Sequence, residues 1–464
     1  MKKKEILTLA LAFALTLGMG VAAASYSAQA LGRDDTGVGI LQQNADENAL
    51  LQISDAVSNI ANENARLRVA WWGNQERNNT TIEVLDEYAA LTGAKLTYEY
   101  TVWTGYVENL MTQAAGNNLP DLIQISTTDL VDFSRSGQLL DLQSYIDSGV
   151  IDTTGISGDA LSGGVVDGVL TGFSTGLNTV SVVYNQAVFE EAGVDAPADD
   201  WTWSDYLKTV KTIYEATGIP SDIPFLTEAR WVLESMVRSY GYEFFSTEGD
   251  SDGGLLPWAE DETVIAGLTD VLSDIYDGIQ EGFFIDPETQ MSWSATEDYY
   301  IIQGKSAASF ILNNYYTTYC YAFGDELGLA MLPKMDDGTE SGMYALPSMY
   351  WCISAGCEDP EAAASLINYL INDTDAALTI GMDRGVSLSS EIRSAFFASE
   401  DTDVYTKNVF AFVDHVSETV SAVTPPDPEN SAEVIEVMKE AYQSMMYGEL
   451  SVEEGIAQIL ESSR

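Results

Sequence analysis

LRVAWW at residues 67–72 opens the stretch that decides the fold, and LIQI at 122–125 closes it. Both segments are mostly apolar, which is typical of strands buried on both faces. Between them, apolar residues recur at helical spacing over 79–92 and 106–115, and a further strand is predicted at 95–100. This β-α-β-α-β order predicts an α/β fold, in which helices cover both faces of a parallel sheet. Ligands of such sheets bind at the carboxyl ends of the strands.

The remainder of the chain continues the mixture of helices and strands. The region from Val188 through Ile279 is mainly helical, and Pro425-Pro426-Asp427-Pro428 is the strongest break in the chain. Strands are predicted at 309–312, 327–332 and 349–354, and helices at 361–370, 431–446 and 452–460.

The N-terminus has the pattern of a secretory signal peptide. A basic start and the uncharged stretch 6–24 precede Ala28 and Ala30, the small residues that a signal peptidase reads. We therefore predict a signal peptide at 1–30 and a polar linker at 31–65. An uncleaved anchor is the alternative, because the uncharged stretch just reaches spanning length. In either case the folded part is expected on the extracellular side of the membrane.

Charge and length narrow the function classes. Of 464 residues, 72 are Asp or Glu and 20 are Lys or Arg, which gives a formal net charge of −52. We expect no nucleic-acid partner, because binding phosphates requires basic residues that displace counterions. The acidic residues are interpreted as a solvated coat that keeps an exported protein soluble. The length favours two or three domains.

The positions of the three cysteines predict no lipid anchor and do not establish a disulfide bond. None of Cys320, Cys352 and Cys357 follows the signal segment, so no lipid-acceptor cysteine is expected. The odd count leaves at least one thiol free or in an intermolecular bond. Cys352 and Cys357 pair only if the chain turns between them. We predict buried, inert thiols.

The sequence lacks the residues that most kinds of catalytic site require. His415 is the only histidine, which excludes Ser-His-Asp triads, Cys-His pairs and multi-histidine metal sites. The segment Gly304-Lys305-Ser306 is no phosphate loop, because Tyr299 stands where that loop needs glycine. The segment 250–254 lacks the final acid of a calcium loop and is predicted to be a solvated turn. No cofactor or metal is expected, whereas a glycosidase with paired carboxylates stays open.

Short motifs occur in a characteristic order over residues 66–464. They are WWG at 71–73 with Arg77, WTGY at 103–106, AAGNNLPDLI at 114–123, GQLLDL at 137–142, GKSAA at 304–308, LP at 332–333 and DRGV at 383–386. The most specific stretch joins Tyr184-Asn185, FEEAGV at 189–194 and WTWSDY at 201–206. Together the motifs resemble the family 1 extracellular solute-binding proteins of bacterial ABC sugar importers. Ser387 stands where the family usually continues into proline.

The resemblance implies a periplasmic-binding-protein-like fold of type II, with two α/β lobes around a ligand cleft joined by a hinge. Lobe one would comprise 66–179 with 350–424, and lobe two 180–349 with 425–464; the third crossing between them would fall near Pro425.

Its implied function is that of a monomeric, non-enzymatic extracellular component of an ABC importer. Such a protein binds a carbohydrate, expected here to be an oligosaccharide, and delivers it to the transmembrane subunits of a permease. The alternatives are a binding protein for a peptide or another polar solute, and a secreted glycosidase.

Aromatic rings stack on the apolar faces of sugars, while Asn, Asp, Glu and Arg bind the hydroxyls. Such residues in the expected cleft loops of lobe one are Trp72, Asn74, Arg77, Ser126, Thr127, Asp129, Trp351 and Arg384. Those of lobe two are Glu228, Trp231, Trp293, Asn313, Asn314, Tyr315 and Tyr344, with Tyr316 beside them. Packing is the alternative role for each aromatic residue, and a salt bridge is the alternative for Arg384. Trp71, Trp201 and Trp203 are expected in the core.

Overall fold

The structure, a computed structural model, describes residues 31–32, 40–41, 65–246, 255–419, 423–428 and 430–464. The predicted signal peptide, almost all of the predicted linker and the predicted turn at 250–254 lie outside the described residues. Within the described ranges, no helix is long and apolar enough to cross a bilayer. The short strands β1 (Leu31–Gly32) and β2 (Ile40–Leu41) pair antiparallel.

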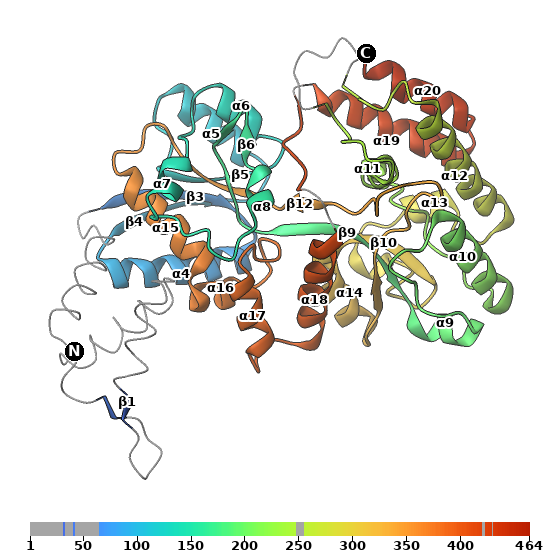
Figure 1. Ribbon diagram of the computed structural model, residues 1–464, viewed down its shortest axis with the longest axis horizontal. Helices are drawn as coiled ribbons and strands as arrows, with labels where there is room; N and C mark the ends of the chain where they lie inside the picture. The colour runs from blue at the N-terminus through green and yellow to red at the C-terminus, as the bar shows by residue number, and fades with distance from the viewer. Residues whose placement is uncertain (1–30, 33–39, 42–64, 247–254, 420–422, 429) are drawn as a thin grey trace. The chain divides into compact units, whose positions relative to one another are not determined.

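The chain divides into two compact units, each built from two stretches of sequence (Figure 1). Unit 1 comprises Met1–Gly176 and Ser348–Ser399, and unit 2 comprises Leu177–Pro347 and Glu400–Arg464. The chain therefore passes from one unit to the other three times.

Unit 1 contains the sheet predicted from residues 67–125. Its strand order is β4-β3-β5-β13-β8, and β3 runs parallel to β4 and β5, whereas β13 runs antiparallel to its neighbours β5 and β8. The strands are β3 (Arg66–Trp72), β4 (Lys95–Thr101), β5 (Leu122–Ile125), β8 (Phe173–Ser174) and β13 (Tyr350–Ile353). A separate short pair is β6 (Val165–Val166) with β7 (Val169–Leu170).

Helices cover both faces of this sheet, as its apolar strands require. Figure 1 shows α5 and α6 on one side of it and α4, α15 and α16 on the other. The helices of unit 1 are α4 (Gln75–Thr92), α5 (Tyr106–Ala115), α6 (Leu130–Arg135), α7 (Gln143–Asp147), α8 (Gly158–Ser162), α15 (Pro360–Asn372), α16 (Thr374–Ile380) and α17 (Ser390–Ala398). The helix predicted to begin at Asn79 begins at Gln75 instead, because the Asn74 side chain caps it by accepting from the Arg77 amide.

Unit 2 is built around strand β9 (Leu177–Tyr184), in a segment for which no strand was predicted. β9 pairs antiparallel with β10 (Ala308–Leu312), β11 (Gly328–Ala330) and β12 (Ala345–Pro347). Its helices are α9 (Gln186–Ala192), α10 (Trp203–Thr217), α11 (Ala229–Ser239), α12 (Glu262–Glu281), α13 (Pro287–Met291), α14 (Tyr316–Phe323), α18 (Val404–Thr419), α19 (Ser431–Tyr447) and α20 (Val452–Ser462). Two single 3-10 turns, η1 (Thr296–Asp298) and η2 (Asn313–Tyr315), complete the unit.

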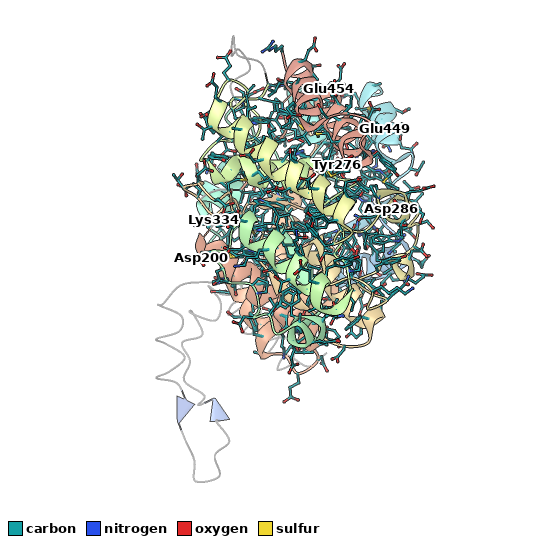
Figure 2. All side chains as sticks on the ribbon, turned by 90° about the vertical axis from the view of Figure 1, so that its right-hand side faces the viewer. Asp200, Tyr276, Asp286, Lys334, Glu449 and Glu454 are labelled. Atoms are coloured by element: carbon teal, nitrogen blue, oxygen red, sulfur yellow. The ribbon has the colours of Figure 1, made fainter. Side chains whose placement is uncertain are left out.

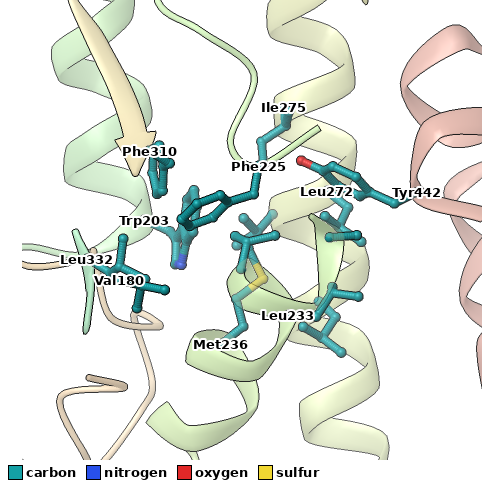
Figure 3. Packing of buried hydrophobic residues seen from close by; sticks show 14 of the residues in the cluster. Val180, Trp203, Phe225, Leu233, Met236, Leu272, Ile275, Phe310, Leu332 and Tyr442 are labelled. Carbon is teal, nitrogen blue, oxygen red and sulfur yellow. The ribbon is translucent and has the colours of Figure 1, made fainter. Parts of the chain in front are cut away.

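The core of unit 2 lies between this sheet and helices α10, α11, α12, α19 and α20 (Figure 3). Trp203 is fully buried and stacks on Phe310 of β10, with ring centroids 5.8 Å apart. Trp201 is also buried and donates its ring N–H to the Met331 carbonyl at 2.9 Å. Both tryptophans thus pack in the core, as predicted, and in unit 1 Trp71 is fully buried as well.

The third passage between the units differs from the expected position. It lies between Ser399 and Glu400, so residues 400–424, which were expected in lobe one, belong to unit 2. Phe412 and Val416 of α18 are part of the unit 2 core, and this packing decides where the helix belongs. The proline-rich break therefore lies inside unit 2, where Asp427 forms a two-pronged ion pair with Arg230 of α11.

Candidate functional site

Two tryptophans lie together where strands β3 and β4 of unit 1 end. Trp72 is the last residue of β3, and its ring meets Trp103 edge-on at 4.9 Å between centroids. Trp103 lies in the loop after β4 and is 49% exposed, whereas Tyr106, which also contacts Trp72, is buried. Gly105 has a φ of 85°, which allows the sharp turn from this loop into α5. The pair offers partly open aromatic surface at the carboxyl ends of parallel strands.

The loop after β5 supplies hydroxyls and a carboxyl group in the same unit. Ser126 and Thr127 are partly exposed. The Ser126 hydroxyl donates to the Asp129 carboxylate and lies 2.9 Å from the Thr128 hydroxyl. Burial raises the pKa of Asp129, an effect that the hydrogen bond from Ser126 opposes. These groups have the hydrogen-bonding capacity that a polyhydroxylated ligand needs.

Asn74 and Arg77, two predicted contacts, are used by the fold. Asn74 is exposed, but its side-chain oxygen caps helix α4. The Arg77 guanidinium pairs with the Asp383 carboxylate at 2.6 Å and donates to the Asp383 carbonyl at 2.8 Å. The pair joins α4 to the loop that follows α16.

Arg384 and Trp351 are buried in unit 1. The Arg384 guanidinium donates to Gln124 at 2.9 Å and to Thr81 at 2.8 Å, and it lies 5.6 Å from the Trp351 ring centroid. Burial lowers the pKa of Arg384, while the nearby Asp383 opposes the shift. Arginine keeps its charge at neutral pH even so. Both side chains are structural in this conformation and present no surface to a ligand, because each is less than 5% exposed.

Five aromatic rings gather in unit 2, although they come from two separate segments. Trp293 contacts Tyr299 and Tyr300, with centroids 5.2 and 5.3 Å apart. Tyr299 contacts Tyr319, and Tyr319 contacts Tyr315, which is 50% exposed. We call these five residues the aromatic cluster. It includes two predicted contacts, Trp293 and Tyr315.

Two polar atoms next to Tyr315 in the chain lack hydrogen-bond partners in the part of the chain that the structure describes. The Asn313 side-chain oxygen accepts from the Thr179 amide at 2.8 Å, so this buried residue fastens η2 to β9. Its side-chain nitrogen and the side-chain oxygen of Asn314 have no hydrogen-bond partner among the described residues. A buried polar atom left unpaired costs about 1–3 kcal/mol, and such atoms concentrate at functional sites.

The remaining predicted contacts lie around helix α11. Tyr344 is fully buried, donates to the Trp231 carbonyl at 3.0 Å and packs under the Arg238 guanidinium. Trp231 is half-buried against Phe225 of the core. Glu228, just before α11, is exposed by area, yet partial desolvation raises the pKa of its carboxyl group, while Lys439 opposes the rise. Of these three predicted contacts, Glu228 is exposed, Trp231 is half-buried and Tyr344 is fully buried.

The histidine and the cysteines of the described residues lie in different surroundings. His415 is exposed and contacts Asp199 at 3.0 Å. Burial raises the pKa of the Cys352 and Cys357 thiols, which keeps both protonated at neutral pH. Among the described residues, the three thiols form no disulfide, and no group of three or more His, Cys, Asp or Glu side chains could hold a metal ion.

Residues 72–377 match the sequence pattern of the family described as bacterial extracellular solute-binding protein. The chain belongs to this family. Among curated relatives of this solute-binding protein, the arabinooligosaccharide-binding protein of Halalkalibacterium halodurans is 29% identical over 30% of this chain and 31% of its own length. The diacetylchitobiose binding protein of Streptomyces coelicolor is 26% identical over 36% of this chain and 38% of its own length. The matches thus span about a third of each relative.

Solved structures agree with the family over most of the chain. A family 1 extracellular solute-binding protein from Alicyclobacillus acidocaldarius superposes with a TM-score of 0.72 at 24% identity, covering 86% of this chain and 98% of its own. A periplasmic oligogalacturonide binding protein from Yersinia enterocolitica gives 0.69 at 21% identity, covering 86% and 100%. A designed cysteine esterase gives 0.73 at 21% identity, covering 86% and 97%. At these identities the likeness shows the fold, which is that of the periplasmic solute-binding proteins, with two α/β lobes and a hinge.

Four aromatic residues of these surfaces were not among the predicted contacts: Trp103, Tyr299, Tyr300 and Tyr319. The sequence offered a signal for Trp103, because it comes just after the second strand, whereas Trp72 ends the first. The tyrosines had none beyond their abundance, because only the tertiary fold brings residues 299–300 against 315–319.

Proposed function

We propose that this protein is the substrate-binding component of an ABC importer and binds a carbohydrate, most simply an oligosaccharide. Each unit carries partly exposed aromatic rings beside groups that accept or donate hydrogen bonds, and this combination carries the proposal. Trp72 and Trp103 with Ser126 and Asp129 supply it in unit 1. The aromatic cluster with Asn314 supplies it in unit 2. Sugars need apolar stacking and hydroxyl pairing at once.

The proposed ligand contacts follow from exposure. They are Trp72, Trp103, Ser126, Thr127 and Asp129 in unit 1, and Glu228, Trp293, Tyr299, Tyr300, Asn314 and Tyr315 in unit 2. The protein is proposed to be exported by the signal at 1–30, to act as a monomer and to deliver its ligand to the permease without chemical change. The raised pKa values of the buried Cys352 and half-buried Cys357 thiols, together with the exposed position of His415, support a binding role over nucleophilic catalysis.

Intrinsic tryptophan fluorescence during titration with a panel of neutral and acidic oligosaccharides tests the proposal. Saturable binding is expected, and Tyr315→Ala should weaken it about tenfold, because a stacked ring contributes on the order of 1 kcal/mol or more. Tyr321→Ala is the matched control, since Tyr321 is a 61% exposed tyrosine of α14 that contacts Tyr405 and not the aromatic cluster. Binding to peptides with none to sugars would contradict the proposal. Release of reducing ends from a polysaccharide would instead identify a glycosidase.

A further inference from the structure

Unit 2 contains a groove beside the aromatic cluster. None of the residues predicted as ligand contacts lines this groove. Its volume is about 560 Å³, within the range of about 300–1,000 Å³ that is typical of small-molecule sites. The end of α12, the start of α13, the end of α19 and Tyr300 form its walls. Figure 2 shows the face of unit 2 on which Asp286, from the start of α13, and Glu449, just after α19, both lie.

Tyr300 connects the groove to the aromatic cluster. Tyr300 lines the groove, and its ring contacts the Trp293 ring with centroids 5.3 Å apart. Tyr447, the last residue of α19, lines the groove as well and is 44% exposed. Ring contacts therefore run from Tyr315 through the cluster to Tyr300, which lines the same groove as Tyr447, although Tyr319 within this series is only 7% exposed.

The lining combines these rings with groups that pair with hydroxyls. Gln280, Asp286 and Thr289 supply amide, carboxylate and hydroxyl groups, while Pro287 adds an apolar surface. Asp286 uses one carboxylate oxygen to cap α13 by accepting from the Glu288 amide at 2.8 Å. This mixture fits a sugar better than a purely apolar ligand.

The charge around the groove selects against acidic ligands. No lysine or arginine is among the described residues that line it. Desolvation raises the pKa of the Tyr447 hydroxyl, and the nearby carboxylates of Glu288, Asp286 and Glu449 add to the rise. The Lys305 ammonium lies 5.4 Å from the centroid of the Tyr300 ring and donates to Gln303 at 2.7 Å, but Lys305 is not among the lining residues. The carboxylates of Asp286, Glu288 and Glu449 outweigh this one charge, so we expect a uronate or phosphate to bind less well than a neutral sugar.

We propose that this groove is an additional saccharide subsite, which holds the continuation of a neutral oligosaccharide whose leading sugars stack on the aromatic cluster. The inference rests on the proposed function, because it assigns the length and charge of the same ligand. The expected behaviour is an affinity that rises with chain length until the groove is filled.

Titration calorimetry with a size series of the neutral sugar that binds best, from disaccharide to hexasaccharide, tests this. Tyr447→Ala should weaken binding of the hexasaccharide about tenfold and leave disaccharide binding unchanged. Gln280→Ala, which removes an exposed side chain of the same groove, should act in the same direction with a smaller loss. Tyr321→Ala, the matched control, should change neither affinity.

Disaccharide binding also serves as the control for folding. An equal loss at every length, or no loss at any length, overturns the groove assignment while sugar binding stands. A Tyr447→Ala variant that binds all sugars normally but supports less transport in permease vesicles also overturns it, since the groove would then serve a protein partner. If the unmodified protein binds no sugar of any length, the proposed function fails instead. Tighter binding of oligogalacturonides than of neutral sugars would refute the charge argument.

Discussion

At the scale of single residues, burial separates the side chains that hold the fold from those that are free for a ligand. Arg384 and Tyr315 were both candidate ligand contacts from the sequence, yet Arg384 is 4% exposed and Tyr315 is 50% exposed. The buried Arg384 guanidinium has hydrogen-bond partners within the protein, Gln124 and Thr81. The exposed Tyr315 meets solvent beside side-chain amide atoms of Asn313 and Asn314 that have no hydrogen-bond partner among the described residues.

Replacing Arg384 tests this structural role. Arg384→Ala should lower the free energy of unfolding by about 2–4 kcal/mol, because Gln124 loses its partner in a buried site and Trp351 loses the guanidinium above it. Urea unfolding without ligand, followed by tryptophan fluorescence, measures the loss. Arg66→Ala, at an exposed position of the same unit, is the control and should change stability by less than about 0.5 kcal/mol. Equal stability of the two variants would argue that Arg384 is held for a ligand.

Asp222, which lies close enough to Tyr299 and Tyr319 of the aromatic cluster to affect their pKa values, gives a pH-dependent prediction. Burial raises the pKa of its carboxyl group to about 6, against which the Ser306 and Ser309 hydroxyls act, although neither carboxylate oxygen has a hydrogen bond of standard geometry. A raised folded pKa means that the ionised form is penalised in the fold. The penalty is full above pH 6, fades as the pH falls toward the unfolded value of 3.8 and is absent below it.

Asp222→Asn should therefore stabilise the protein above pH 6 by up to about 3 kcal/mol, since each pKa unit corresponds to about 1.4 kcal/mol. The gain should shrink to nothing near pH 4. Urea unfolding of both proteins across this range gives the difference, which isolates Asp222 from the other carboxyl groups. A gain independent of pH would show that the carboxylate is not the source of the penalty.

At the scale of elements, local chemistry set the ends of most helices and strands. The strand at 122–125 and the helix at 106–115 form over the residues that their periodicity predicts. Helix α4 begins a turn early because its cap, Asn74, lies ahead of the first apolar residue of the pattern. Strand β9 was not predicted as a core element, because its sequence, LNTVSVVY, mixes polar and apolar residues without regular alternation, although six of its eight residues are buried.

The cap of α4 is open to a direct test. Asn74→Ala should cost about 1 kcal/mol of stability, because the Arg77 amide loses its acceptor, whereas Asn74→Ser should retain most of it. Hydrogen exchange in the first turn of α4, together with urea unfolding, measures both. We expect sugar affinity to be the same in the two variants. Equal stability with a shared loss of affinity would instead make Asn74 a ligand contact.

At the scale of the whole molecule, charge is the dominant global property. A formal net charge of −52 makes the folded chain repel itself, because folding brings its carboxylates closer together. The ion pairs that the described residues do form, such as Arg77 with Asp383 and Arg230 with Asp427, hold loops onto helices within each unit.

Added salt should therefore stabilise the protein. Sodium chloride at about 1 M shortens the Debye length to ~3 Å, which screens repulsion between surface carboxylates while leaving the partly buried ion pairs largely intact. We expect the thermal midpoint to rise by several degrees between low salt and about 1 M, measured by scanning calorimetry. Sucrose of equal osmolality controls for general solvent effects. A midpoint that falls with salt would mean that attractive ion pairs, rather than repulsion, dominate.

The sequence by itself determined the α/β class, the order of the first strands and helices, the family and the kind of side chain that lines the proposed site. These follow from local periodicity and from motifs that are contiguous in the chain, which need no knowledge of distant packing. Only the tertiary structure decided that Arg384, Trp351 and Tyr344 are buried, that α18 belongs to unit 2, and that residues 293–300 meet 315–319 in one aromatic cluster. The physical reason is that exposure is a property of what packs against a side chain, and its neighbours come from segments far away in sequence.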